Sequence, residues 1–126
     1  MLEERLNGLY EGYGYRKFRM SKFEEYDLYA RNKDFLKSGH IITFTDVDGS
    51  LKALKPDITL SIMKNNNGGS EKVYYNENVY RDMGGSFQEI LQVGVESVGQ
   101  IDPYAEAEVI ALAAKSLEVL SPRYVL

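Results

Sequence analysis

Residues 87–98 are predicted to form a β-strand that presents a row of polar side chains on one face. Successive side chains of a strand point to opposite faces, so Gln92, Gly94 and Glu96 share one face. Gly94 carries no side chain, which predicts a bare strip of sheet between an amide and a carboxylate. A small polar ligand could lie on this strip and be held at both ends. The alternative is an ordinary solvent-facing strand, since antiparallel sheets often have one wet face.

A single arginine stands where the preceding strand is expected to end. Arg81 comes shortly before a flexible turn that contains Gly84 and Gly85. A guanidinium fixed at such a point can form paired hydrogen bonds with a phosphate or a carboxylate. The alternative is that Arg81 pairs with Asp82 or Glu89 across the hairpin, and the sequence leaves both interpretations open.

The stretch Asp-Val-Asp-Gly-Ser at 46–50 resembles the first motif of haloacid-dehalogenase-type phosphatases. That resemblance implies Asp46 as the nucleophile and Asp48 as the acid/base, with Mg²⁺ between phosphate and protein. The mechanism also needs a downstream Lys and a late acidic pair on a parallel sheet, and no later aspartate of this chain completes such a pair. Asp-Gly is instead a strong signal for a tight turn. We therefore expect a β-hairpin here and keep the phosphatase as a remote alternative.

The composition limits the functions that are open to the chain. Its 126 residues predict a single domain over 1–126. The chain has no Cys and only one His, His40, which argues against thiolate catalysis, disulfides and metal sites built on Cys or on pairs of His. The net charge of −4 argues against a protein that mainly covers phosphate backbones. No apolar run approaches the ~20 residues of a membrane span, and no secretory signal is expected, so the predicted location is cytoplasmic.

The patterning predicts the α+β class, an antiparallel sheet with flanking helices. Asp102 is expected to cap the last helix, with Pro103 in its first position. Helices are expected at residues 2–10, 26–30, 56–64 and 103–120. Extended segments are expected at 15–25, 41–45, 51–54, 72–81 and 87–98, with 123–126 as the beginning of another. Two apolar faces are expected to pack in the core: Phe87, Leu91, Val93 and Val95 of the last long strand, and Val109, Ile110, Ala113, Leu117 and Leu120 of the last helix.

Taken in order, these segments resemble the catalytic core of class II aminoacyl-tRNA synthetases in its histidyl form. Residues 9–15 and 23–24 resemble the first motif, a helix that leads into a strand at the dimer interface. Residues 44–59 resemble the family's hairpin and its histidine-contacting element, an acidic residue followed two positions later by threonine. Residues 80–99 resemble the second motif, and 102–110 resemble the helix that follows it. The resemblance covers nearly the whole chain.

The resemblance implies roles for five residues. Asp57 and Thr59 match the histidine-contacting element. Gln92 and Glu96 match the residues that hold the amino group and the imidazole of histidine. Arg81 matches the arginine that grips the α-phosphate of ATP. No catalytic residue, metal ligand or cofactor is assigned to this chain.

Three departures favour a paralogue of the synthetase, the regulatory subunit of ATP phosphoribosyltransferase. Asp57 stands where the synthetase usually has Glu, the turn after Arg81 is short and poor in arginine, and Ser21 replaces the proline expected in the first motif. We therefore expect a non-catalytic protein of histidine biosynthesis that binds L-histidine and a catalytic phosphoribosyltransferase subunit, but neither tRNA nor membranes. A homodimer through the first motif is also implied. The alternative is a fragment of a histidyl-tRNA synthetase, which activates histidine with ATP.

The resemblance further implies that the chain is a truncated core. The full core of the family is considerably longer, and its third motif, with another ATP-gripping arginine, is expected beyond Leu126. We therefore expect this chain alone to lack both the synthetase reaction and full regulatory function.

Overall fold

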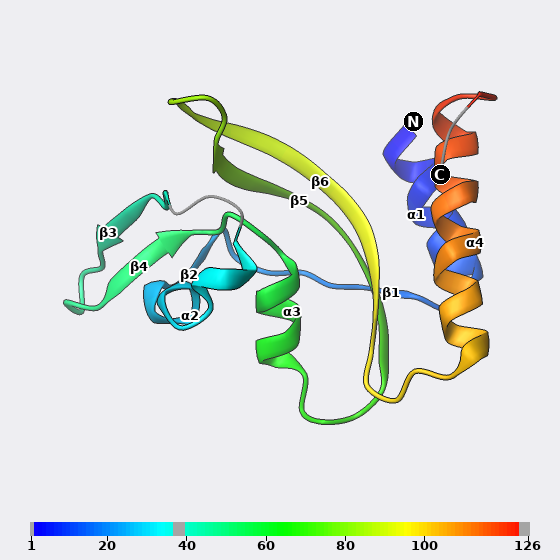
Figure 1. The fold of residues 1–126 in the computed structure, drawn as a ribbon, viewed down its shortest axis with the longest axis horizontal. Helices are drawn as coiled ribbons and strands as arrows, with labels where there is room; N and C mark the ends of the chain where they lie inside the picture. Colours follow the sequence, from blue (N-terminus) through cyan, green and yellow to red (C-terminus); the bar gives the residue numbers. More distant parts are fainter. Residues whose placement is uncertain (1, 37–39, 124–126) are drawn as a thin grey trace. The chain divides into compact units, whose positions relative to one another are not determined.

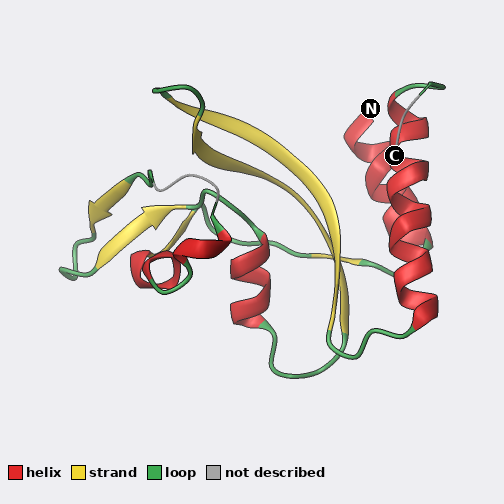
Figure 2. Ribbon diagram, viewed as in Figure 1, coloured by secondary structure: helices red, strands yellow, loops and turns green. Residues whose placement is uncertain are grey.

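The computed structural model describes residues 2–36 and 40–123, so the strand expected at 123–126 lies outside the described residues except for its first position. Helices and strands are mixed along the chain, which confirms the α+β class (Figures 1 and 2). The helices are α1 (Leu2–Gly12), α2 (Tyr26–Ala30), α3 (Thr59–Asn65) and α4 (Pro103–Leu120), with a 3-10 turn, η1 (Lys33–Phe35). The strands are β1 (Arg16–Lys17), β2 (Phe23–Glu25), β3 (Thr43–Thr45), β4 (Leu51–Leu54), β5 (Glu71–Asp82) and β6 (Phe87–Val98).

The described strands form two three-stranded sheets, in the orders β2-β4-β3 and β1-β5-β6. Both pairings of the first sheet are antiparallel. In the second sheet β1 runs parallel to β5, with Arg16 opposite Val73 and Lys17 opposite Tyr74. The alternation within residues 15–25 did not predict this parallel pair, because a strand of two residues carries no periodic signal.

The hairpin of β3 and β4 excludes the phosphatase alternative. The two strands are antiparallel neighbours, and the turn between them places Gly49 at φ 88°. The Asp48 carboxylate binds within the turn itself. Its Oδ1 accepts hydrogen bonds from the Ser50 backbone N–H at 2.9 Å and from the Ser50 hydroxyl at 2.6 Å. A haloacid-dehalogenase-type site needs a parallel crossover after its aspartates, so that interpretation of residues 46–50 is wrong.

The chain divides into two compact units. The first unit comprises Met1–Phe18, Asn66–Asn76 and Val93–Leu126, and the second comprises Arg19–Asn65 and Glu77–Gln92. The boundaries at 76–77 and 92–93 fall inside β5 and β6, so both long strands contribute residues to each unit.

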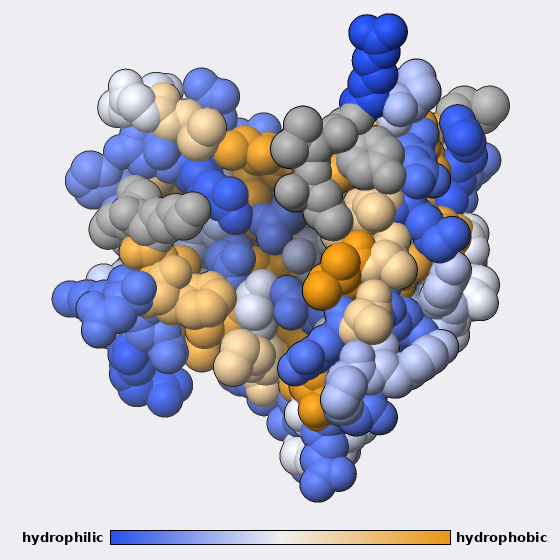
Figure 3. Space-filling view, turned by 45° about the vertical axis from the view of Figure 1, so that its right-hand side comes forward, coloured by the Kyte–Doolittle hydropathy of each residue, from blue (hydrophilic) through white to orange (hydrophobic). Residues whose placement is uncertain are grey.

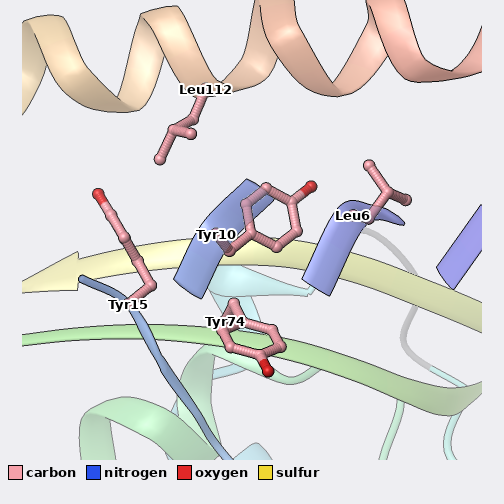
Figure 4. Close-up of a cluster of buried hydrophobic side chains, with 5 residues drawn as sticks. All are labelled: Leu6, Tyr10, Tyr15, Tyr74 and Leu112. Atoms are coloured by element: carbon pink, nitrogen blue, oxygen red, sulfur yellow. The ribbon is translucent and has the colours of Figure 1, made fainter. Parts of the chain in front are cut away.

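The core of the first unit lies between α1, α4 and the strands. Helices α1 and α4 lie side by side (Figure 1), and Leu112 points from α4 toward α1 (Figure 4). Tyr10 joins the layers, because its ring centre lies 5.7 Å from that of Tyr74 and its hydroxyl lies 2.7 Å from Ser116 Oγ. The buried cluster consists of Leu6, Tyr10, Tyr15, Tyr74 and Leu112, with Val93 and Val95 packed against it.

Helix α4 begins as predicted but buries a different face. The Asp102 carboxylate accepts a hydrogen bond from the Ala105 N–H at 2.7 Å, which confirms the cap. Of the expected apolar face, however, Ile110 is 60% exposed and Leu120 is also exposed, whereas Leu112 is fully buried. The helix is apolar on most sides, so its sequence does not single out one stripe. Apolar side chains accordingly remain visible at the surface (Figure 3).

An ion pair with one buried partner joins β5 to α4 in the first unit. The Glu108 side chain is only 7% exposed, and its carboxylate lies 2.7 Å from Lys72 Nζ. Lys72 also donates a hydrogen bond to the Tyr13 carbonyl at 2.6 Å and lies 4.7 Å from the centre of the Tyr15 ring. The hydrogen bond from Lys72 lowers the pKa of Glu108, while burial, together with the nearby Glu108 carboxylate, raises the pKa of Tyr15 to about 12.

A tight glycine turn closes the β5–β6 hairpin in the second unit. Met83 N–H donates to the Ser86 carbonyl at 2.8 Å, and the two residues between them, Gly84 and Gly85, have φ of 76° and 97°. Two central residues at positive φ match the twist of a two-residue hairpin and favour glycine. The four residues 83–86 therefore connect β5 to β6. The bounds of both strands lie within one residue of the predicted segments 72–81 and 87–98.

The antiparallel sheet of the second unit packs on α2. Tyr29 and Ala53 are fully buried, and Leu28 and Leu60 complete the cluster. On β2, in contrast, Phe23 is half exposed, and its ring meets that of Phe44 edge-on, with the ring centres 5.1 Å apart.

Candidate functional site

The second unit holds a cavity of about 490 Å³ that contains two of the five residues singled out above. Asp57 and Arg81 both line it. An apolar wall beside opposite charges is a combination that orients a small ligand while burying its carbon skeleton. The lining residues are Phe35, Leu36, His40, Pro56, Asp57, Arg81, Asp82 and Met83.

Arg81 is held at the cavity by two hydrogen bonds. Its Nε donates to the Pro56 carbonyl at 2.8 Å, and its Nη2 donates to Gln92 Oε1 at 2.7 Å. A guanidinium has five N–H groups in a rigid plane, so these two bonds fix its orientation. The remaining N–H groups are the ones that an anion in the cavity would meet.

The alternative interpretation, in which Arg81 pairs with an acid of the hairpin, is not what these bonds show. Glu89 accepts a hydrogen bond from Asn78 Nδ2 at 3.0 Å, and Asp82 pairs with a different residue. The backbone carbonyl of Pro56 serves as a partner instead, which a pattern of charges does not reveal.

Asp57 and Thr59 mark the start of α3. Asp57 Oδ2 accepts a hydrogen bond from the Leu60 N–H at 3.2 Å, and Thr59 is the first residue of the helix. The predicted helix began at 56, but Pro56 and Asp57 precede it. The hydrogen bond from the Leu60 N–H fixes the position of the Asp57 carboxylate at the start of the helix. Asp57 therefore has a defined place in the cavity wall.

The strip of β6 at Gly94 is not bare, contrary to expectation. A Cβ atom on Gly94 would lie 2.5 Å from Tyr75 Oη and 2.8 Å from Tyr75 Cζ. The Tyr75 side chain, which is buried, therefore covers this position from the neighbouring strand. The pattern of one strand does not predict what its neighbour places over it.

The five predicted residues are thus brought together only in part. Asp57 and Arg81 line one cavity, and Gln92 is joined to it through its bond to Arg81. Thr59 follows two residues after Asp57. Glu96 is half-buried on β6 and belongs to the first unit.

Two ionisable residues of the cavity, His40 and Asp82, were not predicted as site residues. His40 Nδ1 lies 2.5 Å from Asp82 Oδ2, and Asp82 Oδ1 also accepts a hydrogen bond from the Gly85 N–H at 2.8 Å. The pair spans 42 positions in the sequence. The only signal in the sequence for this pair was that His40 is the single His of the chain. It gave no indication that Asp82 is its partner.

We expect replacement of His40 to change the titration of Asp82. The hydrogen bond from His40, and secondarily that from the Gly85 N–H, lowers the pKa of Asp82. A carboxyl with a lowered pKa stabilises the fold above its unfolded-state pKa, and this stabilisation is lost as the pH falls through the folded-state pKa. In His40→Ala, the midpoint of Asp82 in a carbon-13 NMR titration should rise toward the ordinary range. The midpoint of Glu108, in the first unit, serves as the control and should not move; an unchanged Asp82 midpoint would contradict the assigned cause.

Neither a metal cluster nor a membrane span occurs among the described residues. Across 2–36 and 40–123, no three His or acidic side chains are grouped so that they could hold a metal ion. No helix in the same ranges is both long enough and apolar enough to cross a bilayer.

Comparison with known proteins gives two kinds of relative. A protein-family model described as histidyl-tRNA synthetase matches residues 1–125. The histidine–tRNA ligase of Solibacter usitatus is 28% identical over 130 residues, covering 93% of this chain and 31% of the relative. The ATP phosphoribosyltransferase regulatory subunit of Ruminiclostridium cellulolyticum is 28% identical over 126 residues, covering 93% of this chain and 30% of the relative. The chain therefore spans about a third of the length of the curated relatives it matches.

Similarity of structure extends the comparison to the fold. A solved ATP phosphoribosyl transferase complex from Thermotoga maritima contains a chain that matches with a TM-score of 0.72 at 19% identity, covering 93% of this chain and 40% of that chain. At this level of identity the likeness concerns the fold alone.

Proposed function

Because the chain belongs to the histidyl-tRNA synthetase family, we propose that it acts as a non-catalytic regulatory subunit of an ATP phosphoribosyltransferase. The turn between β5 and β6 carries the proposal. Gly84 and Gly85 close the hairpin, and residues 82–86 contain no basic side chain. By resemblance, a synthetase uses a longer, basic loop at this place against ATP and the end of the tRNA.

The charges around the cavity support an amino acid as the ligand rather than a nucleotide. The lining contains two carboxylates, those of Asp57 and Asp82, besides the Arg81 guanidinium. A triphosphate would bring several negative charges to this wall, and like charges at short range repel. An amino acid brings an ammonium and a carboxylate together, and each finds an opposite charge.

In this proposal, Arg81 binds the carboxylate of L-histidine and Asp57 binds its ammonium, because both line the cavity of the second unit. The roles of Thr59, as part of the histidine-contacting element, and of Gln92 and Glu96, as residues that contact histidine, rest on the resemblance alone. The support from the geometry is the fixed guanidinium and the capping carboxylate in one cavity wall.

Calorimetry with L-histidine tests this site. We expect heat of binding with the unmodified chain and at least about a tenfold weaker Kd for Glu96→Ala, because loss of a hydrogen bond to a charged group costs about 1.5–3 kcal/mol. Glu89→Ala is the matched control, since Glu89 lies on the same strand and bonds to Asn78. Absence of heat with the unmodified chain, or equal heats for it and Glu96→Ala, would show that histidine is not bound in this way.

The proposed partner is tested by co-purification. A catalytic ATP phosphoribosyltransferase subunit should elute with a full-length protein that contains this sequence, and its activity should respond to L-histidine only when that protein is present. Separate elution with unchanged activity would argue against the regulatory role.

The second candidate is a fragment of a histidyl-tRNA synthetase. It is supported by relatives named histidine–tRNA ligases that are as similar to the chain as the regulatory subunits are. Histidine-dependent exchange between ATP and pyrophosphate, measured on a full-length protein that contains this sequence, separates the two candidates, because only the synthetase forms an aminoacyl-adenylate. Exchange above background would favour this candidate over the regulatory one.

A homodimer through the first motif is part of the proposal. The sheet of β2, β4 and β3 leaves Phe23 half exposed beside Phe44. An exposed aromatic pair is a suitable centre for a contact between two copies. Small-angle scattering of the chain in solution should give the mass of at least two copies.

A further inference from the structure

Helix α3 begins two residues after Asp57 of the cavity wall, and it is too short to be stable by itself. It has seven residues, Thr59–Asn65, whereas isolated helices shorter than about 12–15 residues are marginal in water. The place of α3 is therefore set by what it packs against. Leu60, Ser61 and Ile62 are its buried residues, and Ser61 is the polar one among them.

A carboxylate from strand β2 binds this helix at two points. Glu24 Oε2 accepts a hydrogen bond from the Ser61 hydroxyl at 3.1 Å, and Glu24 Oε1 accepts one from Lys64 Nζ at 2.6 Å. Oε1 also accepts a hydrogen bond from the Glu25 N–H at 3.0 Å, which orients the carboxylate itself. Ser61 and Lys64 are three positions apart, so they lie on one face of the helix. Two attachments one turn apart fix both the rotation and the position of α3.

The Glu24 side chain is charged and largely shielded from water, with 9% of it exposed. Burial by itself raises the pKa of Glu24, but the hydrogen bonds from Lys64, from the Glu25 N–H and from Ser61 outweigh burial, so this pKa is lowered. Hydrogen bonds to an ionised acceptor are stronger than those between neutral groups. Glu24 therefore binds α3 more tightly than a neutral side chain of the same size.

The residue that Glu24 binds in the first turns of α3 adjoins the amide that holds Asp57. The Leu60 N–H donates to Asp57 Oδ2 at 3.2 Å, and Ser61 is the next residue along the chain. A displacement of α3 at Ser61 would therefore move this N–H away from the carboxylate. Side chains that meet a ligand keep their positions only when the groups behind them are themselves fixed.

We propose that Glu24 is a positioning residue for the cavity of the second unit: by fixing α3, it fixes the Leu60 N–H and thereby the Asp57 carboxylate. Glu24 is not among the lining residues of the cavity, so it acts through α3 and does not touch the ligand. Glu24, α3 and Asp57 all belong to the second unit. The effect on L-histidine rests on the proposed function, whereas the effect on the Leu60 amide does not.

Two measurements on a full-length protein that contains this sequence test the proposal. The first is amide exchange at Leu60, followed by NMR in protein labelled with nitrogen-15 leucine, which reports the bond to Asp57 without any ligand. Glu24→Gln keeps the size of the side chain but removes its charge, and it should accelerate this exchange about tenfold. The second is calorimetry, in which the same variant should bind L-histidine about tenfold more weakly.

Two substitutions of Lys64 separate positioning from a general loss of stability. Lys64→Met removes a donor to Glu24 and should change both measurements in the same direction as Glu24→Gln, whereas Lys64→Arg keeps a cationic donor and should retain both original values. Glu25→Gln is the matched control, because it removes the same charge one residue further along β2, where Glu25 pairs with Lys52 of β4. It should change neither measurement. Exchange at Leu112, in the first unit, should stay the same in all four variants, which excludes global unfolding as the cause.

Two results would overturn the proposal. One is a Leu60 amide that exchanges at the same rate in Glu24→Gln as in the unmodified protein. The other is faster exchange at Leu60 with an unchanged Kd for L-histidine, which would show that α3 does not position the site. If the unmodified protein binds no L-histidine, the proposed function fails, and the exchange rate at Leu60 alone then decides whether Glu24 fixes Asp57.

Discussion

Gly99→Ala is expected to lower the free energy of unfolding by about 3 kcal/mol, from the combined cost of backbone strain and overpacking. Gly99 has φ of 107°, a conformation that residues with a Cβ atom rarely adopt. The added Cβ would lie 2.6 Å from Ser70 Cα and 2.9 Å from the Gly69 carbonyl oxygen. These are backbone atoms of the facing loop and do not move aside by rotating a side chain.

Urea unfolding followed by circular dichroism measures this effect. Gly8→Ala is the matched control, because Gly8 lies in α1 with nothing within 4 Å of its added Cβ. In a helix interior alanine is favoured over glycine, so this control should gain up to about 1 kcal/mol. The same substitution should therefore act with opposite signs at the two positions. A loss at Gly99 no larger than a few tenths of a kcal/mol would mean that the loop at Ser70 yields easily.

Lys72→Met is expected to destabilise the chain by about 3 kcal/mol at neutral pH, because it leaves the Glu108 carboxylate buried without its cation. The pair is 2.7 Å long, and Lys72 also bonds to the Tyr13 carbonyl. Since the pKa of Glu108 is lowered, the stabilisation from the pair is complete above the unfolded-state pKa of Glu and is lost as the pH falls through the folded-state pKa. The difference between Lys72→Met and the unmodified chain should therefore shrink in acid.

Arg16→Met provides the comparison for this pair. Arg16 lies 3.5 Å from Glu71, but its side chain is 71% exposed, so its loss should cost less than about 1 kcal/mol. Adding Glu108→Gln to Lys72→Met removes the orphaned charge and should recover part of the lost stability. Thermal unfolding at neutral and acidic pH measures all four proteins. Equal losses for Lys72→Met and Arg16→Met would show that solvent reaches Glu108 freely.

Local signals in the sequence predicted the elements well. Asp102 and Pro103 predict the start of α4, because Asp102 caps the helix and Pro103 has a fixed φ suited to its first position. The paired glycines 84 and 85 predict the turn between β5 and β6. Each of these signals acts over about four residues, so no distant contact is needed to read it. The face that α4 buries was predicted less well, because Leu112 and Ile110 are equally apolar and only the position of α1 distinguishes them.

The candidate site depended on information of another kind. Gln92 and Arg81 were singled out by the patterns of their strands, and the family resemblance added Asp57 to them. The spacing of the three residues in the sequence gives no reason to place them in one cavity. His40 and Asp82 were missed because their contact joins segments far apart in the chain. The role of the Pro56 carbonyl as a hydrogen-bond acceptor for Arg81 was missed as well, because every residue has a backbone carbonyl and the residue type does not show which one is used.

The contact between Tyr75 and Gly94 couples these two positions during evolution. An added Cβ at position 94 would lie 2.5 Å from Tyr75 Oη and 2.8 Å from Tyr75 Cζ, so Tyr75→Phe alone leaves a close contact. A larger residue at 94 therefore requires the Tyr75 ring to shift, or a smaller residue at 75 that would leave a void in the sheet surface. Homologues with a larger residue at 94 should accordingly differ at position 75 more often than homologues that keep the glycine.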